Sequence, residues 1–370
     1  MKGGQKLWSS TWRLAVCGAL MLWILHAIFV KEGRLALARD GQAWDALARA
    51  EQWQAAWHHG PRELWRVLCL IDPWAGLLSV IFMGLTILLG VLRWRMVLRV
   101  QGLELPFTRA AEISLVAHFF NSFLLGSTGG DLLKAYYAAR ETHHKKTEAV
   151  VTVFVDRLLG LFAMLLFACL MMPLNFALLS DHGKLRLLSL LIVAMMIGCG
   201  VVLGISLWGG VSRQWPAARE WLRRFPKAEV LERSLESCRR FGREWNFLFS
   251  SLALSMALNV VCVLQFIALA WGLGLQISPT VLFVIVPIVI CISALPITPS
   301  GLGVRENLYV IMLAAPAINI AATQALSLSL LAYAGSLFWS LVGGVLYVCL
   351  KETQHLAEVT EANERTEVGS

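Results

Sequence analysis

Long apolar stretches separated by short polar segments dominate the chain. A helix needs about 20 apolar residues to cross the hydrocarbon core of a bilayer. Six stretches approach or exceed that length, and we predict a full membrane span in each: residues 12–30, 74–92, 149–172, 186–208, 248–272 and 322–350. The first is long for a signal sequence and lacks a small-x-small cleavage site, so we expect it to be retained as a span.

Two further apolar stretches run directly into glycine- or proline-rich polar segments. Residues 110–126 are followed by Gly129 and Gly130, and residues 279–297 are followed by Pro299. Glycines and prolines in such number disfavour an uninterrupted helix. We therefore predict two broken, re-entrant segments, each of which enters and leaves the membrane on the same side.

The composition indicates a lipid solvent rather than water. The chain is 58% hydrophobic and only 15% charged, whereas a soluble domain carries about 25% charged residues. Between Trp245 and Lys351 the only charged residues are Arg305 and Glu306, and no soluble protein could cover its surface in that way. The sequence therefore predicts an all-α polytopic membrane protein.

Charges between the spans predict the orientation of the chain. The net charge of +8 is concentrated in short basic segments, as expected for cytoplasmic loops, so we do not expect nucleic-acid binding. The basic N-terminus, residues 93–109 and residues 212–247 are placed in the cytoplasm, the last as an amphipathic surface helix. Residues 31–73 have balanced charges and a helix-like pattern, so they are placed outside, on the membrane surface. Both termini are expected in the cytoplasm, with residues 351–370 as a disordered tail.

The predicted elements group into two halves of a single transmembrane domain, residues 1–350. Half one covers about residues 74–172, half two covers about residues 248–350, and segment 212–247 links them. Each half contains a span, a broken segment and a second span, and the charge pattern gives the halves opposite orientations. Inverted repeats with paired, interrupted segments are typical of transporters, and the interruptions indicate the binding site.

The first break combines glycines with polar and basic side chains. Thr128 and Asp131 have the spacing of a capping box, which would start a new helix. A helix N-terminus with free N–H groups is suited to binding an anion. The candidate binding residues here are Asn121, Gly129, Gly130, Asp131, Lys134 and Arg140. An ordinary cytoplasmic turn with solvated charges is the alternative interpretation.

The second break carries the only charges of an otherwise apolar half. Broken backbone within a membrane is tolerated where it is buried in protein or lines a wet cavity. The candidate binding residues here are Thr298, Gly301, Gly303, Arg305 and Glu306. The alternative is a helix break in which Arg305 and Glu306 pair at the membrane interface and only fix the topology.

A third candidate is the pair Asp156-Arg157, which lies inside a predicted span. Ionisable residues within a span are costly and mark substrate or proton pathways. We expect Asp156 to meet Lys134 or Arg305. We expect Arg157 to meet Glu306 or a lipid phosphate. A purely structural ion pair between the halves is the alternative.

Other chemistry finds little support in the sequence. The eight cysteines are scattered singly, and the chain has no Cys-x-x-Cys pair, metal-ligand cluster, phosphate-binding loop or nucleophile elbow. We therefore expect neither a cofactor nor a metal site, and a transporter rather than an enzyme.

With these motifs in place, the chain resembles the flippase-like family that includes the transmembrane region of lysylphosphatidylglycerol synthases. The resemblance covers nearly all of residues 10–350. Three segments carry it: residues 121–140, Val155-Asp-Arg-Leu-Leu-Gly-Leu161 and, most specifically, Leu295-Pro-Ile-Thr-Pro-Ser-Gly-Leu-Gly-Val-Arg-Glu306. The chain departs from the family pattern near Leu125, where a proline is expected, at Lys134 (arginine) and at Asp156 (often glutamate).

The resemblance implies lipid handling, namely movement of an amphipathic lipid with a phosphate or modified head group between leaflets of a bacterial inner membrane. It also implies that five residues occupy family-characteristic positions: Asp131, Lys134, Arg157, Arg305 and Glu306. Only a short tail follows the last predicted span, so we expect no aminoacyl-transferase domain and no aminoacylation.

We expect membrane lipids with an anionic head group as partners, and a homo-oligomer is left open. The alternative function is a membrane-embedded enzyme or enzyme subunit acting on lipid-linked sugars, with Asp131 or Glu306 as its base. A solute transporter is a third hypothesis.

Overall fold

The computed structural model describes residues 43–123, 129–141, 146–181, 183–208, 240–295, 303–320 and 322–367, with a few isolated positions before residue 39 and residues 238 and 301. Among these residues the chain is helical and contains no strand. It divides into two compact units, residues 1–75 and 76–370, and each is described by itself.

The described part of the first unit is built around helix α2, which runs from Arg49 to Leu70. The Trp57 indole N–H donates to Nδ1 of His26 over 2.9 Å, which ties α2 to the chain before it. A small buried cluster completes this unit: Phe29, Leu37, Trp44 and Ala56. The position of residues 31–73 on a membrane surface stays a prediction.

Among the described residues of the second unit, five long helices are apolar enough to cross a membrane, by length and composition. They are α3 (Pro73–Val100), α6 (Lys146–Met171), α8 (Gly183–Trp208), α12 (Trp245–Gly272) and α15 (Ala322–Glu367). A short 3-10 turn, Met172–Asn175, and α7, Phe176–Asp181, connect α6 to α8. These helices match five of the six predicted spans. The predicted span 12–30 and segment 212–247 lie mostly outside the described residues.

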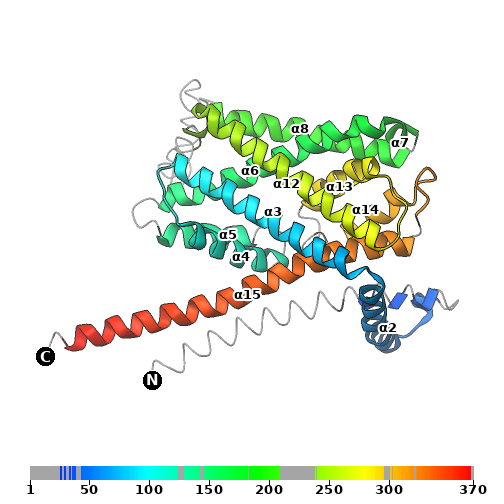
Figure 1. Cartoon of the computed structure of the whole chain (residues 1–370), viewed down its shortest axis with the longest axis horizontal. Coiled ribbons are helices and arrows are strands. Elements are labelled where there is room, and N and C mark those ends of the chain that lie inside the picture. Colours follow the sequence, from blue (N-terminus) through cyan, green and yellow to red (C-terminus); the bar gives the residue numbers. More distant parts are fainter. Residues whose placement is uncertain are drawn as a thin grey trace. The chain divides into compact units, whose positions relative to one another are not determined.

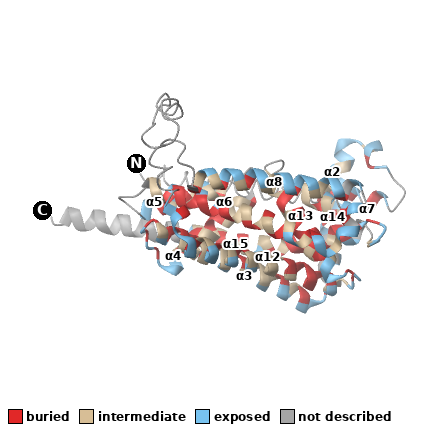
Figure 2. Ribbon diagram, turned by 90° about the horizontal axis from the view of Figure 1, so that it is seen from above, coloured by how far each residue is buried: buried red, intermediate tan, exposed pale blue. Residues whose placement is uncertain are grey.

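Two pairs of shorter helices occupy the predicted breaks. Helices α4 (Phe107–Phe123) and α5 (Gly129–Glu141) form the first pair, and α13 (Pro279–Ser293) and α14 (Val304–Leu313) form the second. In Figures 1 and 2 the first pair lies toward one end of the long helices and the second pair toward the other end. Each pair begins where one long helix ends and finishes near the start of the next.

Helix α3 is longer than the hydropathy predicted. We placed Arg93, Arg95 and Arg99 in a loop after residue 92, but α3 carries all three before it ends at Val100. Gly102 terminates it with a φ of 65°. The Leu103 N–H donates to the Leu98 carbonyl over 3.1 Å, and the Gly102 N–H donates to Arg99 over 2.9 Å. These two bonds form a Schellman motif, which satisfies the last carbonyls of the helix.

Helix α12 ends in the same way. Gly274 has a φ of 66°, its N–H donates to the Trp271 carbonyl over 2.9 Å, and the Leu275 N–H donates to Ala270 over 2.9 Å. Helices α3 and α12 are both 28 residues long. Matching features of the two halves are 172 residues apart. This holds for the first residues of α3 and α12, for the glycines that end them, and for the first residues of the helices that follow, α4 and α13.

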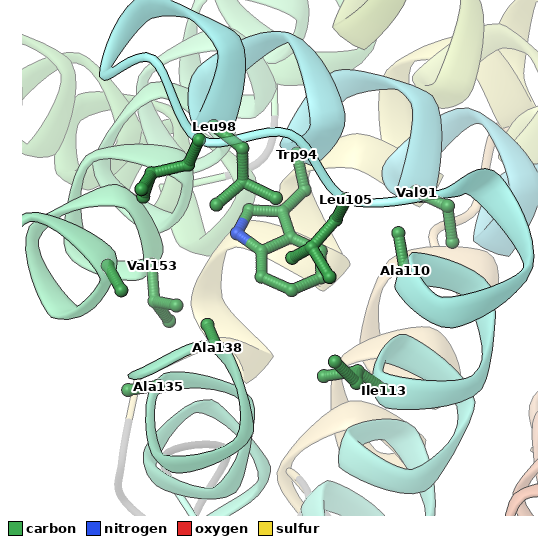
Figure 3. Close-up of a cluster of buried hydrophobic side chains, with 11 residues drawn as sticks. Val91, Trp94, Leu98, Leu105, Ala110, Ile113, Ala135, Ala138 and Val153 are labelled. Carbon is green, nitrogen blue, oxygen red and sulfur yellow. The ribbon is translucent and has the colours of Figure 1, made fainter. Parts of the chain in front are cut away.

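A buried apolar cluster packs the first short pair against the ends of α3 and α6. Figure 3 shows the indole of Trp94 at its centre, between α3, α4, α5 and α6. Its buried members are Val91, Trp94, Leu98, Leu103, Leu105, Ala110, Ile113, Ala135, Ala138, Ala149 and Val153. A second cluster joins α3, α6, α8 and the start of α12 through residues such as Val97, Leu159 and Leu207. The first cluster fixes the face of α5 that carries Lys134.

Helix α15 crosses α4 at very short range, and glycines make this possible. A Cβ added at Gly343 would collide with the backbone carbonyl of Leu115, and one added at Gly344 would lie 2.8 Å from the Phe119 ring. The close approach seats the α4–α5 pair on α15, as small residues do at helix interfaces in membranes.

Replacing Gly343 by alanine is therefore expected to lower stability by about 1–3 kcal/mol, because the added methyl group meets backbone that cannot move aside. Thermal unfolding of the purified protein in detergent measures the effect. Gly204→Ala on α8 is the matched control, since a Cβ there meets nothing and alanine favours helix by about 1 kcal/mol. Equal melting temperatures for the two variants would contradict the close packing.

Helix α15 continues beyond the predicted span and ends at Glu367. The disorder of the tail over residues 351–370 stays a prediction. The segment contains no proline, and its first glycine is Gly369. Its alanines and glutamates are good helix formers, so a helix that has already started at Ala322 continues without a nucleation cost.

Candidate functional site

The start of α5 is anchored directly to the end of α4. The Gly130 N–H donates to Oδ1 of Asn121 over 2.9 Å, which satisfies one of the free amides at the N-terminus of α5. A Cβ added at Gly130 would collide with the carbonyl of Ala117. Asn121 and Gly130 therefore hold the two helices together, while Gly129 begins α5.

Asp156 lies at the centre of a buried ion network. Its carboxylate accepts a hydrogen bond from Nε of Arg93 over 2.8 Å and one from Nζ of Lys134 over 3.3 Å. Arg93 also donates to the hydroxyl of Ser255 over 3.1 Å. The network thus joins α3, α5, α6 and α12. The side chains of Arg93, Lys134 and Asp156 are only 13%, 11% and 10% exposed.

A second ion pair lies at the edge of this network. Arg157 and Asp131 pair over 3.1 Å, with side-chain exposures of 44% and 24%. Because Asp131 and Lys134 are three residues apart on α5, they share a face of that helix. We call Arg93, Asp131, Lys134, Asp156 and Arg157 the cation-rich centre, since it contains three cations and two carboxylates.

Aromatic and small residues shape the cation-rich centre. The Lys134 ammonium lies 4.2 Å from the centroid of the Trp94 ring, a cation–π contact that partly replaces water. The indole N–H of Trp94 is buried and has no hydrogen-bond partner among the described residues. Gly160 makes room for Arg93, since a Cβ there would lie 2.8 Å from a guanidinium nitrogen.

Arg305 and Glu306 form a separate cluster at the start of α14. Glu306 accepts from the Gly303 N–H over 2.5 Å and from Arg305 over 2.6 Å, so it caps the helix and neutralises its neighbour. Arg305 also donates to the hydroxyl of Ser329 over 3.3 Å and stacks 4.6 Å from the Tyr333 ring. We call this cluster of Gly303, Arg305, Glu306, Ser329 and Tyr333 the α14 cap.

The glycines of the second break have the conformations that only glycine adopts easily. Gly301 has a φ of 69° and Gly303 a φ of 84°, which explains why glycines occur there. Nearby, the hydroxyl groups of Tyr309 and Tyr333 are buried without a hydrogen-bond partner among the described residues. The α14 cap is therefore polar but contains equal numbers of positive and negative charges.

The structure brings together most of the predicted residues, in two groups rather than one. Asp131, Lys134, Asp156 and Arg157 belong to the cation-rich centre, whereas the described contacts of Arg305 are with α14 and α15. Asp156 has Lys134 as a partner, the first of the two expected. Arg157 pairs with Asp131, a partner that we did not predict.

Six predicted residues are not members of these groups. Asn121, Gly129 and Gly130 form the junction of α4 and α5, and Gly301 precedes α14. Arg140 is exposed on the last turn of α5, about 13 Å along the helix axis from Asp131. Thr298 lies outside the described residues.

The sequence analysis missed Arg93 and Trp94. Arg93 follows an apolar run directly, so its charge was assigned to a loop. A signal was nevertheless present, because the residues after it alternate arginine with Trp, Met, Val and Leu, which are compatible with a continuing helix. Ser255, Ser329 and Tyr333 carried no signal that distinguishes them from other polar residues in spans.

The chain is similar to known membrane proteins over most of its length. The profile of the lysylphosphatidylglycerol synthase TM region matches residues 47–344. The chain is also similar to a UPF0104 membrane protein of the archaeon Methanothermobacter thermautotrophicus, with 22% identity over 283 residues. That alignment covers 71% of this chain and 83% of the relative. The residues matched by the family profile include both short helix pairs and both ionic clusters.

Proposed function

Because the chain belongs to the lysylphosphatidylglycerol synthase TM region family, a membrane protein family of lipid-related function, we propose that it is a lipid translocase. It moves an anionic or phosphate-containing lipid between the two leaflets of its membrane, and no nucleotide hydrolysis is involved. The cation-rich centre binds the head group.

The observation that carries this proposal is the charge imbalance of the cation-rich centre. Among the described contacts of the centre, the three cations Arg93, Lys134 and Arg157 share two carboxylates, and a buried charge that is not fully compensated is costly. An anionic head group would balance it. The more exposed side chain, Arg157, lies where a lipid phosphate would first arrive, while the acyl chains remain in the bilayer.

The geometry also supports two inverted repeats, which suit alternating access. Beyond the matched ends of α3 and α12, a residue at the same relative position in each half contacts the other half. Arg93 of α3 contacts α6 and donates to Ser255 of α12. Gln265, 172 residues later on α12, donates to the Ala332 carbonyl of α15 and to Ser79 of α3.

In this proposal the α4–α5 pair opens to the cytoplasm and the α13–α14 pair to the outside. The basic N-terminus and the arginines near the end of α3 set this orientation. Both termini then lie in the cytoplasm, and the membrane is the inner membrane of a bacterium. Rocking of one half against the other would expose the head-group site to each leaflet in turn.

The enzyme hypothesis receives less support from the geometry. Its candidate bases, Asp131 and Glu306, are both held by arginines, and Glu306 also caps a helix. A general base is better placed beside a substrate proton than inside a structural ion pair.

Translocation of fluorescent phosphatidylglycerol in proteoliposomes tests the proposal. The purified full chain is expected to speed loss of inner-leaflet fluorescence after an outside quencher is added, relative to protein-free vesicles. Arg157→Ala is expected to slow it by about tenfold, because charge-assisted hydrogen bonds contribute about 1.5–3 kcal/mol. Arg186→Ala, an exposed arginine on α8, is the matched control. No acceleration by the wild type in either orientation would overturn the translocase assignment.

A further inference from the structure

We propose that His118 on α4 is a proton-binding site, through which a proton gradient drives the movement of the two halves. Its ligand is a single proton, which is taken up from one side of the membrane and released to the other. The inference rests on the proposed function in that a movement of the halves carries the cargo. It gives the proposed translocase an energy source other than nucleotide hydrolysis.

His118 lies where the two halves meet. It belongs to α4 in half one, and its ring contacts Ser336 on α15 in half two. Nε2 is 3.2 Å from the Ser336 backbone carbonyl and 3.3 Å from the Ser336 hydroxyl. The same crossing brings Gly343 against the backbone of Leu115, one turn before His118. The imidazole is therefore part of a contact that a relative movement of the halves changes.

The hydrogen bond to Ser336 fixes where a proton can be added to the ring. A carbonyl oxygen only accepts, so Nε2 carries the hydrogen of the neutral ring and Nδ1 is the site for a second proton. Both described hydrogen bonds of the ring are at Nε2, and none is at Nδ1. A protonated ring in this contact would therefore gain both a positive charge and a donor without a described acceptor.

No described ion pair or hydrogen bond joins His118 to a charged side chain. Between Ala322 and Cys349, α15 contains no charged residue. The charged groups of α4 and of the neighbouring α3 and α5 have other described partners or are exposed: Arg93, Arg95, Arg99, Arg109, Glu112, Asp131, Lys134, Arg140 and Glu141. The neutral titratable groups of α5 and of this part of α15 are Tyr136, Tyr137, Tyr333, Tyr347 and Cys349. A buried charge without a counter-ion is costly, so the α4–α15 contact favours the neutral ring.

Proton uptake and the α4–α15 contact therefore oppose each other. A solvated imidazole takes up a proton near about pH 6.5, whereas the contact holds the His118 ring neutral. The contact is then complete well above that pH and is weakened as the pH falls below it. A state in which α4 has left Ser336 binds the proton more tightly, and this difference in affinity lets a proton shift the equilibrium between the two states.

Helix α4 connects His118 to the cation-rich centre. Asn121, one turn after His118, accepts a hydrogen bond from the Gly130 N–H at the start of α5. This bond joins α4 and α5, and α5 carries Asp131 and Lys134. A shift of α4 against α15 therefore displaces two side chains of the centre.

Lipid translocation with and without a pH gradient tests the coupling. The full chain is reconstituted in proteoliposomes that contain fluorescent phosphatidylglycerol and an enclosed pH-sensitive dye. We expect a gradient of about one pH unit to speed translocation in one direction by about tenfold, which corresponds to about 1.4 kcal/mol per proton. The dye should report proton movement during translocation. Equal rates with and without the gradient, or translocation without proton movement, would overturn the inference.

His118→Gln separates proton binding from packing. Glutamine keeps an N–H donor for the Ser336 carbonyl but takes up no proton, so translocation should continue without proton movement and without a response to the gradient. His58→Gln, at an exposed histidine of α2, is the matched control and should behave like the wild type. A His118→Gln protein that still couples proton movement to translocation would contradict the assignment.

Stability measured against pH separates this inference from the translocase proposal. Between about pH 8 and about pH 5.5, the melting temperature of the wild type in detergent should fall further than that of His118→Gln, because only the wild type gains a charge at this contact. That difference, in a protein that translocates no lipid under any condition, would keep the proton site and lose the translocase. Translocation by a protein whose melting has the same pH dependence as that of His118→Gln would keep the translocase and lose the proton site.

Discussion

Asp156→Ala is expected to reduce the yield of folded protein to a small fraction of that of the wild type. The variant leaves Arg93 and Lys134 inside the helical bundle without the carboxylate that both contact. Removing one partner from a buried ion network costs about 3–5 kcal/mol, a large share of the stability of a typical domain. Size-exclusion chromatography and thermal unfolding of detergent extracts measure the loss.

Two further variants separate charge from packing at this position. Arg157→Ala breaks a pair that is partly exposed and should cost little stability. A triple variant with Asp156→Leu, Arg93→Met and Lys134→Met removes all the buried charges and should regain stability, because apolar replacements of buried ion networks are often neutral or stabilising. An Asp156→Ala protein that melts like the wild type would show that the network is not buried as described.

Glu306→Ala is expected to have the second largest effect. It removes the acceptor for the Gly303 N–H and the counter-ion of Arg305 at once. Loss of a helix cap costs about 0.5–2 kcal/mol, and an unsatisfied buried charge adds more. We expect a loss of about 3 kcal/mol in stability, measured by thermal unfolding, with release of the α13–α14 pair from α15.

Glu306→Gln is the matched comparison for the α14 cap. Its amide oxygen still accepts from Gly303, so the cap is retained while the negative charge is lost, and an intermediate stability is expected. Equal stabilities for the alanine and glutamine variants would assign the effect to the charge alone. Wild-type stability for both would contradict the capping role.

The spans could be predicted from the sequence because they depend on local properties. Length and hydropathy identified α3, α6, α8, α12 and α15, and glycines and prolines identified both interruptions. These signals act over a few residues and need no knowledge of packing. The predicted end of α3 was wrong for the same reason, because hydropathy falls at Arg93 although the helix continues.

Pairing among the charged residues could not be predicted to the same degree. Arg93 and Asp156 are 63 residues apart in the chain, and their contact depends on how α3 packs against α6. Lys134 was one of two expected partners of Asp156, whereas Asp131 was not among the expected partners of Arg157. By contrast, the alternative in which Arg305 pairs with Glu306 is present in the structure, because adjacent residues at a helix start need no tertiary packing to meet.

The matched ends of α3 and α12 bear on how such a chain could arise. The same terminal glycine, the same pair of backbone bonds and the same interval to the next helix occur in both halves, although the halves are proposed to point in opposite directions. Duplication of a gene for one half accounts for this only if the ancestral polypeptide inserted into its membrane both ways and assembled as an antiparallel pair. On that account, fusion would have fixed one orientation for each copy, and Arg93 and Gln265 would occupy equivalent positions that diverged afterwards.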